Sequence, residues 1–540
     1  MNEQHGRRVR RQMAPAALSV AAITTMVWVA GASGAVANER VVIALDPPTV
    51  ESNLFWHGIG ERMPSMYALV GQDPITGEYD NSELAAEWSA NDGFTEWTFR
   101  LHEDAQFHFD WGPVTAHDVV HSYELHVGPD STIVAIEHLR AKEVEALDDH
   151  TVVFRFDDPR TDYAFHHAGR GAMVVYSKAQ YDEEGVDGYH AMPAGTAPYQ
   201  FKERRMGEGV IFERAPDHWQ GIEPDFAELY IRWAGEPATK LALLLAGEAH
   251  IVDLPREIQG EALAAGKEII ASQNPAMHTG AVFKGVYNRT GDEAHNPDLP
   301  WGDIRIREAM NRALDREQMI EILYDGRAEP VVRWGMHPPH EGYVAELEER
   351  FEAEYGYDPE RAKELLAEAG YPDAFPDPVV PIVVTTLTGN PEFGTMAELL
   401  QVYFEEIGLQ TEMREMDWAA LGTLSRARQD YVIAPIRNAP IRPTEAGIVN
   451  FFTTRGTPYG GFEDDQIEEL ANALQNAIDP DEREQIAREA WTYLFEVYAD
   501  MPLAAVHAEV TVDPTVVAGW TFPGVTTNSV GHYHLIEAAN

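Results

Sequence analysis

A pair of histidines is the part of this sequence that comes nearest to a catalytic motif. The run His117-Asp118-Val119-Val120-His121 would place two imidazoles one helical turn apart, the spacing at which zinc proteases hold their metal. Those enzymes carry Glu where this chain has Asp118, and the shorter side chain moves the general base away from a metal-bound water. With 21 His in 540 residues, such a pair is also expected by chance. A zinc-dependent hydrolase using His117 and His121 is therefore the alternative function, and no metal site is predicted.

Other signatures of catalysis are missing from the sequence. There is no nucleophile elbow and no glycine-rich phosphate loop, and the chain contains no Cys. His102, His108 and the pair His166-His167 could bind nickel, but they have no compact ligand spacing. We predict a protein that is not an enzyme and needs no cofactor, so any ATPase it works with is another subunit.

The charge balance excludes one class of partner. The chain has 89 Asp and Glu against 40 Lys and Arg, a formal net charge of -49. Such a surface repels a nucleic-acid backbone, so nucleic acid is not expected as a partner. Because the acidic residues are spread along the whole chain, they favour a solvated acidic surface adapted to salt or low pH over a single patch for a cationic ligand.

Residues 1–37 have the order of a secretory signal peptide. Arginines at positions 7, 8, 10 and 11 precede an apolar run from 13 to 36, which ends in Ala35-Val36-Ala37. We expect cleavage near Ala37, by the general secretory route more than the twin-arginine route; an uncleaved membrane anchor is the rival. Without Cys the chain cannot carry a lipid-bearing N-terminal Cys, so the sequence predicts a freely diffusing periplasmic protein.

The elements that would position a binding site alternate between strands and helices. Short strands are predicted at Val41 to Leu45, Trp97 to Leu101, Thr151 to Phe156, Ile382 to Leu387 and Thr411 to Met416, where β-branched or aromatic residues lie between turn formers. Helices are predicted at Ala116 to Leu125, Lys240 to Leu245, Arg305 to Leu323, Glu360 to Ala369, Glu392 to Ile407, Gln466 to Ala477 and Asp481 to Tyr498. The run from 382 to 416 forms a βαβ pattern without the glycines of a dinucleotide site, and short strands are expected at the end of the chain.

Several motifs, read in order, resemble a known family. They are Glu83-Leu84-Ala85-Ala86-Glu87-Trp88, Val114-Thr115-Ala116-His117-Asp118-Val119-Val120, Gly195-Thr196-Ala197-Pro198-Tyr199, Ile304-Arg305-Ile306-Arg307-Glu308-Ala309-Met310 and Tyr357-Asp358-Pro359-Glu360-Arg361-Ala362. In this order they resemble the peptide-, nickel- and oligosaccharide-binding receptors of ABC importers, family 5 of the extracellular solute-binding proteins. The resemblance spans most of the chain after residue 37.

That resemblance implies a fold and a function. The fold would be the α/β, two-lobed periplasmic-binding-protein fold of type II, with an extra subdomain in lobe I and a hinge between the lobes. Residues 38–286 and 499–540 would form lobe I, and residues 287–498 would form lobe II. The protein would be a monomeric receptor that encloses a small peptide-like or anionic polar solute and delivers it to the permease and ATPase of an importer. A chaperone-like or sensory binding protein on the same fold would share these features.

The sequence departs from the family pattern at a segment of the second lobe. Family members that bind zwitterionic peptides usually carry Trp and then an acidic residue after the strand that corresponds to Tyr431 to Ala434. This chain has Arg437, Asn438 and Arg442 there. A guanidinium matches a carboxylate or phosphate, so these residues predict a ligand with an anionic or carbonyl-rich group. The alternative is that the arginines pair with surface carboxylates.

Aromatic residues complete the predicted binding site. The resemblance places Trp56 and His57 in a loop that faces the cleft, while Arg333 and Trp334 lie in a Pro- and Gly-rich loop of the second lobe. Trp418 follows the βαβ unit. Rigid flat side chains of this kind line sites for small molecules, but packing in the core is an equally good explanation for each.

Overall fold

The computed structural model describes residues 39–539 except 49, 58–63, 132–138, 162, 168–172, 337, 339, 373–374, 386–391, 439–443, 455–459, 523 and 525–530. The predicted signal peptide, its cleavage site near Ala37 and Arg442 lie outside the described residues. Within the described ranges, no helix is both long enough and apolar enough to cross a membrane.

Within the described part of the chain, the main sheet has 11 strands and draws on distant parts of the sequence. The strands from the first half of the chain are β1 (Arg40–Leu45), β8 (Tyr199–Arg205), β9 (Gly209–Arg214), β10 (Glu228–Trp233) and β11 (Ile251–Val252). β1 pairs in parallel with both β10 and β11, and β9 joins β10 to β8 in antiparallel order. Beside them, α4 (Pro237–Leu245) and α5 (Arg256–Ala264) pack against each other.

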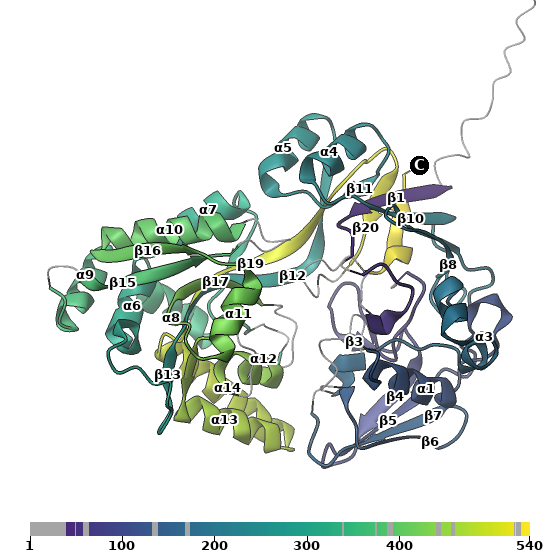
Figure 1. Ribbon diagram of the computed structural model, residues 1–540, viewed down its shortest axis with the longest axis horizontal. Helices are drawn as coiled ribbons and strands as arrows, with labels where there is room; N and C mark the ends of the chain where they lie inside the picture. Colours follow the sequence, from purple (N-terminus) through teal and green to yellow (C-terminus); the bar gives the residue numbers. More distant parts are fainter. Residues whose placement is uncertain are drawn as a thin grey trace, which may run out of the picture. The chain divides into compact units, whose positions relative to one another are not determined.

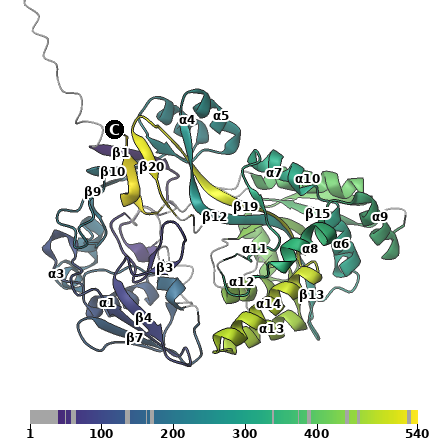
Figure 2. The same ribbon diagram turned by 180° about the vertical axis from the view of Figure 1, so that it is seen from behind.

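Two long strands carry the chain from this part of the sheet to the other. β12 (Glu268–Phe283) has 16 residues and β19 (Asp500–Val512) has 13, and they pair in antiparallel order from Glu268↔Val512 to Val282↔Asp500. Figures 1 and 2 show them side by side. One end of β19 pairs with β11, whereas the far end of β12 pairs with β17 (Ile433–Asn438). Register shifts interrupt the pairing, including one between Thr279 and Gly280, and such irregularities bend and twist a strand locally.

The second half of the chain supplies the other end of the sheet. β15 (Phe375–Val384) and β16 (Leu409–Glu415) are parallel neighbours, and α10 (Glu392–Glu406), which connects them, packs on both. Phe393, Met396, Ala397 and Leu400 are buried on one face of α10, the spacing expected of an amphipathic helix. The predicted βαβ unit is confirmed.

The remaining helices of this half surround its core. They are α6 (Ile304–Arg312), α7 (Arg316–Tyr324), α8 (Glu346–Tyr355), α9 (Pro359–Glu368), α11 (Trp418–Arg426), α12 (Thr444–Phe452), α13 (Asp465–Asn476) and α14 (Pro480–Glu496). The short strands here are β13 (Val286–Asn288), paired with β18 (Phe462–Asp464), and β14 (Glu329–Pro330), paired with β19. One hydrophobic core joins these elements, and its buried members lie between Ala281 and Val506.

A separate antiparallel sheet lies within the first half of the chain. Its order is β4 (Ala85–Ala90), β5 (Glu96–Leu101), β7 (Thr151–Arg155) and β6 (Glu143–Ala146), and α1 (Ala116–Val127) packs on β6 and β7. A capping box between Thr115 and Asp118 starts α1. Outside these two sheets, the first half of the chain also forms β2 (Gly71–Gln72), β3 (Tyr79–Asp80) and α3 (Lys178–Ala191). The last part of the chain forms β20 (Val517–Trp520) and β21 (Ile536–Ala538).

Three predictions about elements were wrong in detail. The helix predicted from Arg305 to Leu323 is two helices, because Asp315 caps a new helix by accepting a hydrogen bond from the backbone N–H of Gln318. β15 begins before Ile382 and ends at Val384. The end of the chain holds the long strand β19 as well as short strands.

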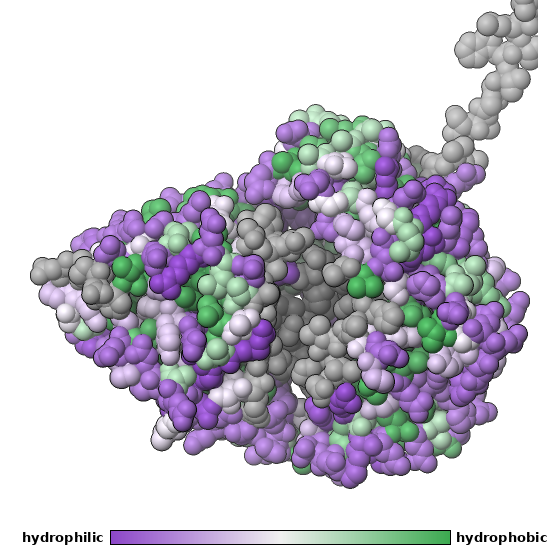
Figure 3. Space-filling model, viewed as in Figure 1, coloured by the Kyte–Doolittle hydropathy of each residue, from purple (hydrophilic) through white to green (hydrophobic). Residues whose placement is uncertain are grey.

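The surface agrees with the acidic composition. Figure 3 shows hydrophilic residues over most of the drawn face, with smaller hydrophobic patches between them. Some ion pairs at this surface join exposed partners, such as Arg361 with Glu364 and Glu368 on α9. Such pairs contribute little individually because water and salt screen them.

Candidate ligand-binding site

Arg437 is a half-buried cation on the strand where the sequence departs from the family pattern. It belongs to β17 and lies opposite Thr279 of β12 in the antiparallel ladder. Among the described residues, no side chain forms a hydrogen bond or ion pair with its guanidinium. Burial lowers the pKa of Arg437 to about 10, and the nearby Glu392 carboxylate opposes that shift. A cation that is desolvated without a direct partner is poised to bind an anion.

The surroundings of Arg437 are built from several elements. The Tyr324 hydroxyl at the end of α7 donates a 3.0 Å hydrogen bond to Thr279 Oγ1. The Arg256 guanidinium lies over the Tyr324 ring, 5.2 Å from its centroid. Arg256 Nη1 is also 3.7 Å from Glu392 Oε1 at the start of α10. The strand β12, the end of α7 and the starts of α5 and α10 therefore bring four residues into one cluster beside Arg437: Thr279, Tyr324, Arg256 and Glu392.

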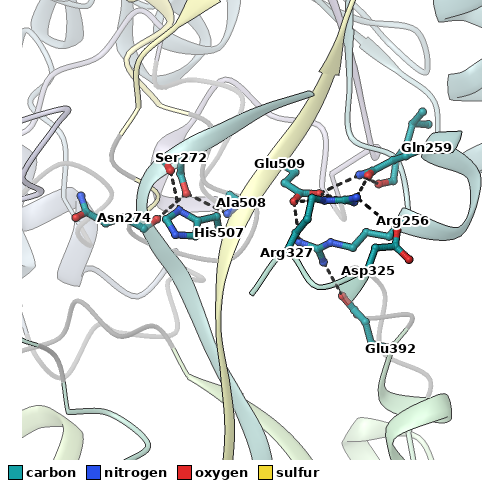
Figure 4. A network of polar contacts seen from close by, with 11 residues as sticks. Arg256, Gln259, Ser272, Asn274, Asp325, Arg327, Glu392, His507, Ala508 and Glu509 are labelled. Carbon is teal, nitrogen blue, oxygen red and sulfur yellow. Dashed lines mark hydrogen bonds and ion pairs between the residues drawn. The ribbon is translucent and has the colours of Figure 1, made fainter. Parts of the chain in front are cut away.

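A second set of contacts holds the Arg256 side chain against Glu509 of the crossing strand β19 (Figure 4). Glu509 of β19 accepts hydrogen bonds from Gln259 at 3.2 Å and from Arg327 Nε at 3.1 Å, and it pairs with Arg256 Nη2 at 3.2 Å. Burial disfavours the Glu509 carboxylate, but Arg327, Arg256 and Gln259 outweigh it and lower the pKa of Glu509. Arg256 thus has its strongest partner in Glu509, and its contact with Glu392 is the longer one.

The negative charge of the Glu392 carboxylate is consequently only weakly compensated by Arg256. Its side chain is 14% exposed. Burial raises the pKa of Glu392, even though Arg256 and Arg437 favour its ionised form. The cluster therefore holds an unpaired guanidinium and a weakly paired carboxylate close together.

The predicted site residues Arg333 and Trp334 lie in the core of the second half. Arg333 is 1% exposed and forms an ion pair with the buried Asp500, and its guanidinium lies over the ring of Phe452. The Trp334 indole donates to the backbone carbonyl of His278 and packs edge-on against Phe451. Both side chains already have packing and polar partners, so a direct role in ligand contact stays a prediction.

Trp56 is also buried. It is 3% exposed and packs edge-on against Tyr176 and Tyr189 in a cluster of the first half of the chain. His57 ends the same short 3₁₀ helix, Trp418 begins α11 and Asn438 ends β17, and these side chains lie outside the described residues. Contact of these residues with a solute stays a prediction.

The histidines of the alternative function do not form a metal centre. His117 is exposed on α1, whereas His121 is buried and its ring lies 4.6 Å from that of Tyr181. No group of three or more His, Asp or Glu side chains is placed to hold a metal ion in the part of the chain that the structure describes. Nothing supports the hydrolase.

Glu392, Arg256 and Tyr324 were not predicted from the sequence. They lie far apart in the sequence from the segment around Arg437, and nothing in their local pattern separates them from scaffold residues. The one available signal was that Glu392 opens a predicted helix directly after the loop of the βαβ unit, where parallel α/β units present ligand-binding residues at the carboxyl ends of strands.

Comparisons with known proteins agree with this architecture. The structure of HbpA2 from Haemophilus parasuis matches with a TM-score of 0.74, 20% identity, and coverage of 91% of this chain and 98% of that one. Heme-binding protein A of Haemophilus influenzae is 25% identical over 62% of this chain and 62% of its own length. Glutathione-binding protein GsiB of Pectobacterium atrosepticum is 24% identical over 76% of this chain and 74% of its own.

The fold is the two-lobed α/β fold of periplasmic binding proteins. Residues 81–458 match the model of the bacterial extracellular solute-binding proteins, family 5. The chain therefore belongs to that family. Its members are binding proteins and not enzymes.

Proposed function

We propose that this chain is the periplasmic receptor of an ABC importer, and that Arg437 holds an anionic or carbonyl-rich group of a small peptide-like solute. The observation that carries the proposal is the half-buried guanidinium of Arg437, which has no hydrogen bond or ion pair among the described residues. Two relatives support a solute that carries carboxylates, since one is named for glutathione and one for heme, and both compounds have carboxylate groups.

The proposal includes the division into lobes. β12 and β19 would be the two crossings, with residues 38–286 and 499–540 in lobe I and residues 287–498 in lobe II. The separate hydrophobic cores support this division, because the largest draws its buried members from Ala281 to Val506 and the others lie outside that range. A solute that contacts both lobes would stabilise the closed arrangement. Delivery would be to a membrane permease driven by a separate ATPase, with the receptor acting as a monomer.

The test is affinity for the molecule that co-purifies with the protein, identified by mass spectrometry. Arg437→Ala is expected to weaken binding by about 2 to 5 kcal/mol, largely because the buried anionic group is left unpaired. Arg442→Ala tests the second predicted arginine in the same way. Binding is measured by calorimetry on protein freed of its solute.

Arg361→Ala is the matched control. Arg361 lies on α9, where its guanidinium pairs with Glu364 and Glu368 at the surface, so its removal should leave affinity unchanged. If Arg437→Ala and Arg442→Ala both bind like Arg361→Ala, the proposed role of these arginines is wrong, and the surroundings of Trp56 and Trp334 become the place to search.

A further inference from the structure

A hydrogen bond joins the two halves of the chain away from the strands that connect them. The hydroxyl of Thr161, which follows β7, donates to a carboxylate oxygen of Glu445 at the start of α12, although 284 residues separate the two. β7 packs against β5, β6 and α1, whereas α12 packs against α13, α14 and β18. Figures 1 and 2 show β7 and α12 below the crossing of β12 and β19 in both views. The contact is therefore separate from the two crossing strands.

The Glu445 carboxylate is held in place by its own half of the chain. The residue is 9% exposed, and Arg483 Nη2 of α14 lies 3.5 Å from Glu445 Oε2. Arg483 also donates to the carboxylate of Glu341 at 2.9 and 3.0 Å and to the carbonyl of Leu474 at 2.8 Å. Arg483 therefore fixes the position of the acceptor and compensates its charge, which allows a buried carboxylate at the boundary between the halves.

The segment that carries Thr161 is anchored in the other half. The backbone N–H of Arg160 donates to the carbonyl of Phe94 at 2.8 Å, and the Arg160 carbonyl accepts a 2.7 Å hydrogen bond from the indole N–H of Trp97. Trp97 is buried in the hydrophobic core around the sheet of β4 to β7. Donor and acceptor thus belong to two separately anchored surfaces, and their bond forms only when the two halves approach each other.

We propose that Thr161 and Glu445 form a latch that holds the two lobes closed around a bound solute. This inference rests on the proposed function, because it assigns Thr161 to lobe I and Glu445 to lobe II. Opening the lobes would separate the donor from the acceptor, so the bond stabilises the closed arrangement and not the open one. Thr161 and Glu445 are therefore positioning residues for retention of the solute.

A latch of this kind acts on the release of the solute and not on its capture. The solute enters before the lobes meet, when the donor and the acceptor are still apart, so the association rate constant should not depend on their bond. Release requires the lobes to open and the bond to break. Loss of the bond should therefore raise the dissociation rate constant, the parameter through which most contacts change affinity. A residue with a purely structural role would instead lower the melting midpoint.

Thr161→Val removes the donor and keeps the shape of the side chain. Since the sequence contains no Cys, Leu147→Cys after β6 and Ala473→Cys on α13, both at exposed positions, place one spin label on each half. Pulsed electron paramagnetic resonance measures the distance between the labels in the protein as purified. The natural side chains should give one short distance, and Thr161→Val should raise the ratio of longer to short distances about tenfold.

The same samples report the release of the co-purified compound. Loaded protein is diluted, and the compound in the filtrate is followed over time by mass spectrometry. Thr161→Val should release it about tenfold faster. Thr98→Val is the matched control, since it makes the same exchange on β5, which pairs with β4 and β7 of its own half, and it should change neither the distances nor the release.

Glu445→Gln tests the acceptor. It weakens the bond by removing the charge, and the double variant with Thr161→Val should release the compound no faster than the faster single variant, because both changes break the same bond. Thermal melts of each variant check that the fold is kept. Additive effects of the two substitutions on release, or unchanged label distances in Thr161→Val, overturn the latch.

Arg437→Ala separates this failure from failure of the proposed function. If the co-purified compound binds and depends on Arg437 while Thr161→Val leaves the label distances unchanged, the latch is wrong and the receptor function stands. If Thr161→Val speeds release while Arg437→Ala binds normally, the latch stands and the role of Arg437 is wrong. If the compound does not rebind to the natural protein, the proposed function fails and the latch fails with it.

Discussion

At the scale of single residues, the structure separates charges that hold the fold together from charges that are available for binding. Arg333 is buried and paired with Asp500, whereas Arg437 is half-buried and has no direct partner among the described residues. Burial raises the pKa of Asp500, and Arg333 opposes that shift. Two arginines that looked alike in the sequence as ligand contacts therefore have different surroundings.

The buried pair gives a prediction about stability. Arg333→Met should lower the free energy of unfolding by about 3 to 5 kcal/mol, because it leaves the Asp500 carboxylate buried with less compensation. The double variant Arg333→Met with Asp500→Leu should recover part of that loss, since both charges are then gone. Chemical denaturation measures both. A loss no larger than that of Arg361→Met would contradict a structural role for Arg333.

A buried histidine that contacts the segment before β8 gives a prediction about pH. His108 is 8% exposed, and burial lowers its pKa to about 4, although its hydrogen bond with the carbonyl of Ala197 favours the charged form. The folded chain therefore prefers neutral His108. Its contribution to stability is complete above pH 6.5, the ordinary value for His, and is lost as the pH falls from 6.5 toward 4.

The measurement is the denaturation free energy between pH 7 and pH 5. His108 should account for about 1 to 2 kcal/mol of the loss over that interval. His108→Gln should reduce the fall in the free energy of unfolding between pH 7 and pH 5, whereas replacing the exposed His117 should not. An unchanged fall in His108→Gln would show that other titratable groups cause it.

At the scale of elements, β12 and β19 depend on close contact of their backbones. A Cβ added at Gly280 would lie 2.2 Å from the carbonyl oxygen of Met501, and the register shift next to Thr279 falls at this point. The only relief is movement of one strand away from the other. The short distance between β12 and β19 therefore requires glycine at position 280, and its backbone angles do not.

Gly280→Ala should therefore lower the free energy of unfolding by about 1 to 3 kcal/mol, the usual cost of overpacking. Gly260→Ala is the matched control, since Gly260 lies within α5 and an added Cβ there meets open space. That change should stabilise the protein by up to about 1 kcal/mol through helix propensity. Equal effects of the two substitutions on the denaturation midpoint would refute the close-contact argument.

The elements also show what sequence patterns can and cannot give. The βαβ unit around α10 was predictable because buried residues at helical spacing lie between two short β-branched runs. The split between α6 and α7 was not recognised, since the apolar periodicity runs on past the capping Asp315. Arg437 was predicted as a ligand contact because it breaks the family pattern. Glu392, Arg256 and Tyr324 were not, because only the tertiary fold brings residues so distant in the sequence together.

At the scale of the whole molecule, the net charge of -49 predicts a response to salt. Added salt screens the repulsion among surface carboxylates, so thermal midpoints should rise from low ionic strength as sodium chloride is added. Melts across a salt series measure this. A flat or falling midpoint would mean that the acidic surface has another explanation.

The predicted leader gives a further test on the intact protein. If cleavage follows Ala37, the mature chain begins at Asn38 and carries no lipid. Intact-mass measurement of periplasmic material decides this. A mass that includes residues 7–36, or an added acyl chain, would contradict it.

The position of β19 in the sheet affects the order in which the protein can fold. This strand lies between β12 and β11, so it joins the two ends of the largest sheet, yet it comes from residues 500–512 near the end of the chain. The neighbouring strands come much earlier in the sequence, and their edges stay exposed until β19 pairs with them. Closure of the sheet is therefore a long-range event, which makes slow folding and a need to protect the open edges the natural consequence of this topology.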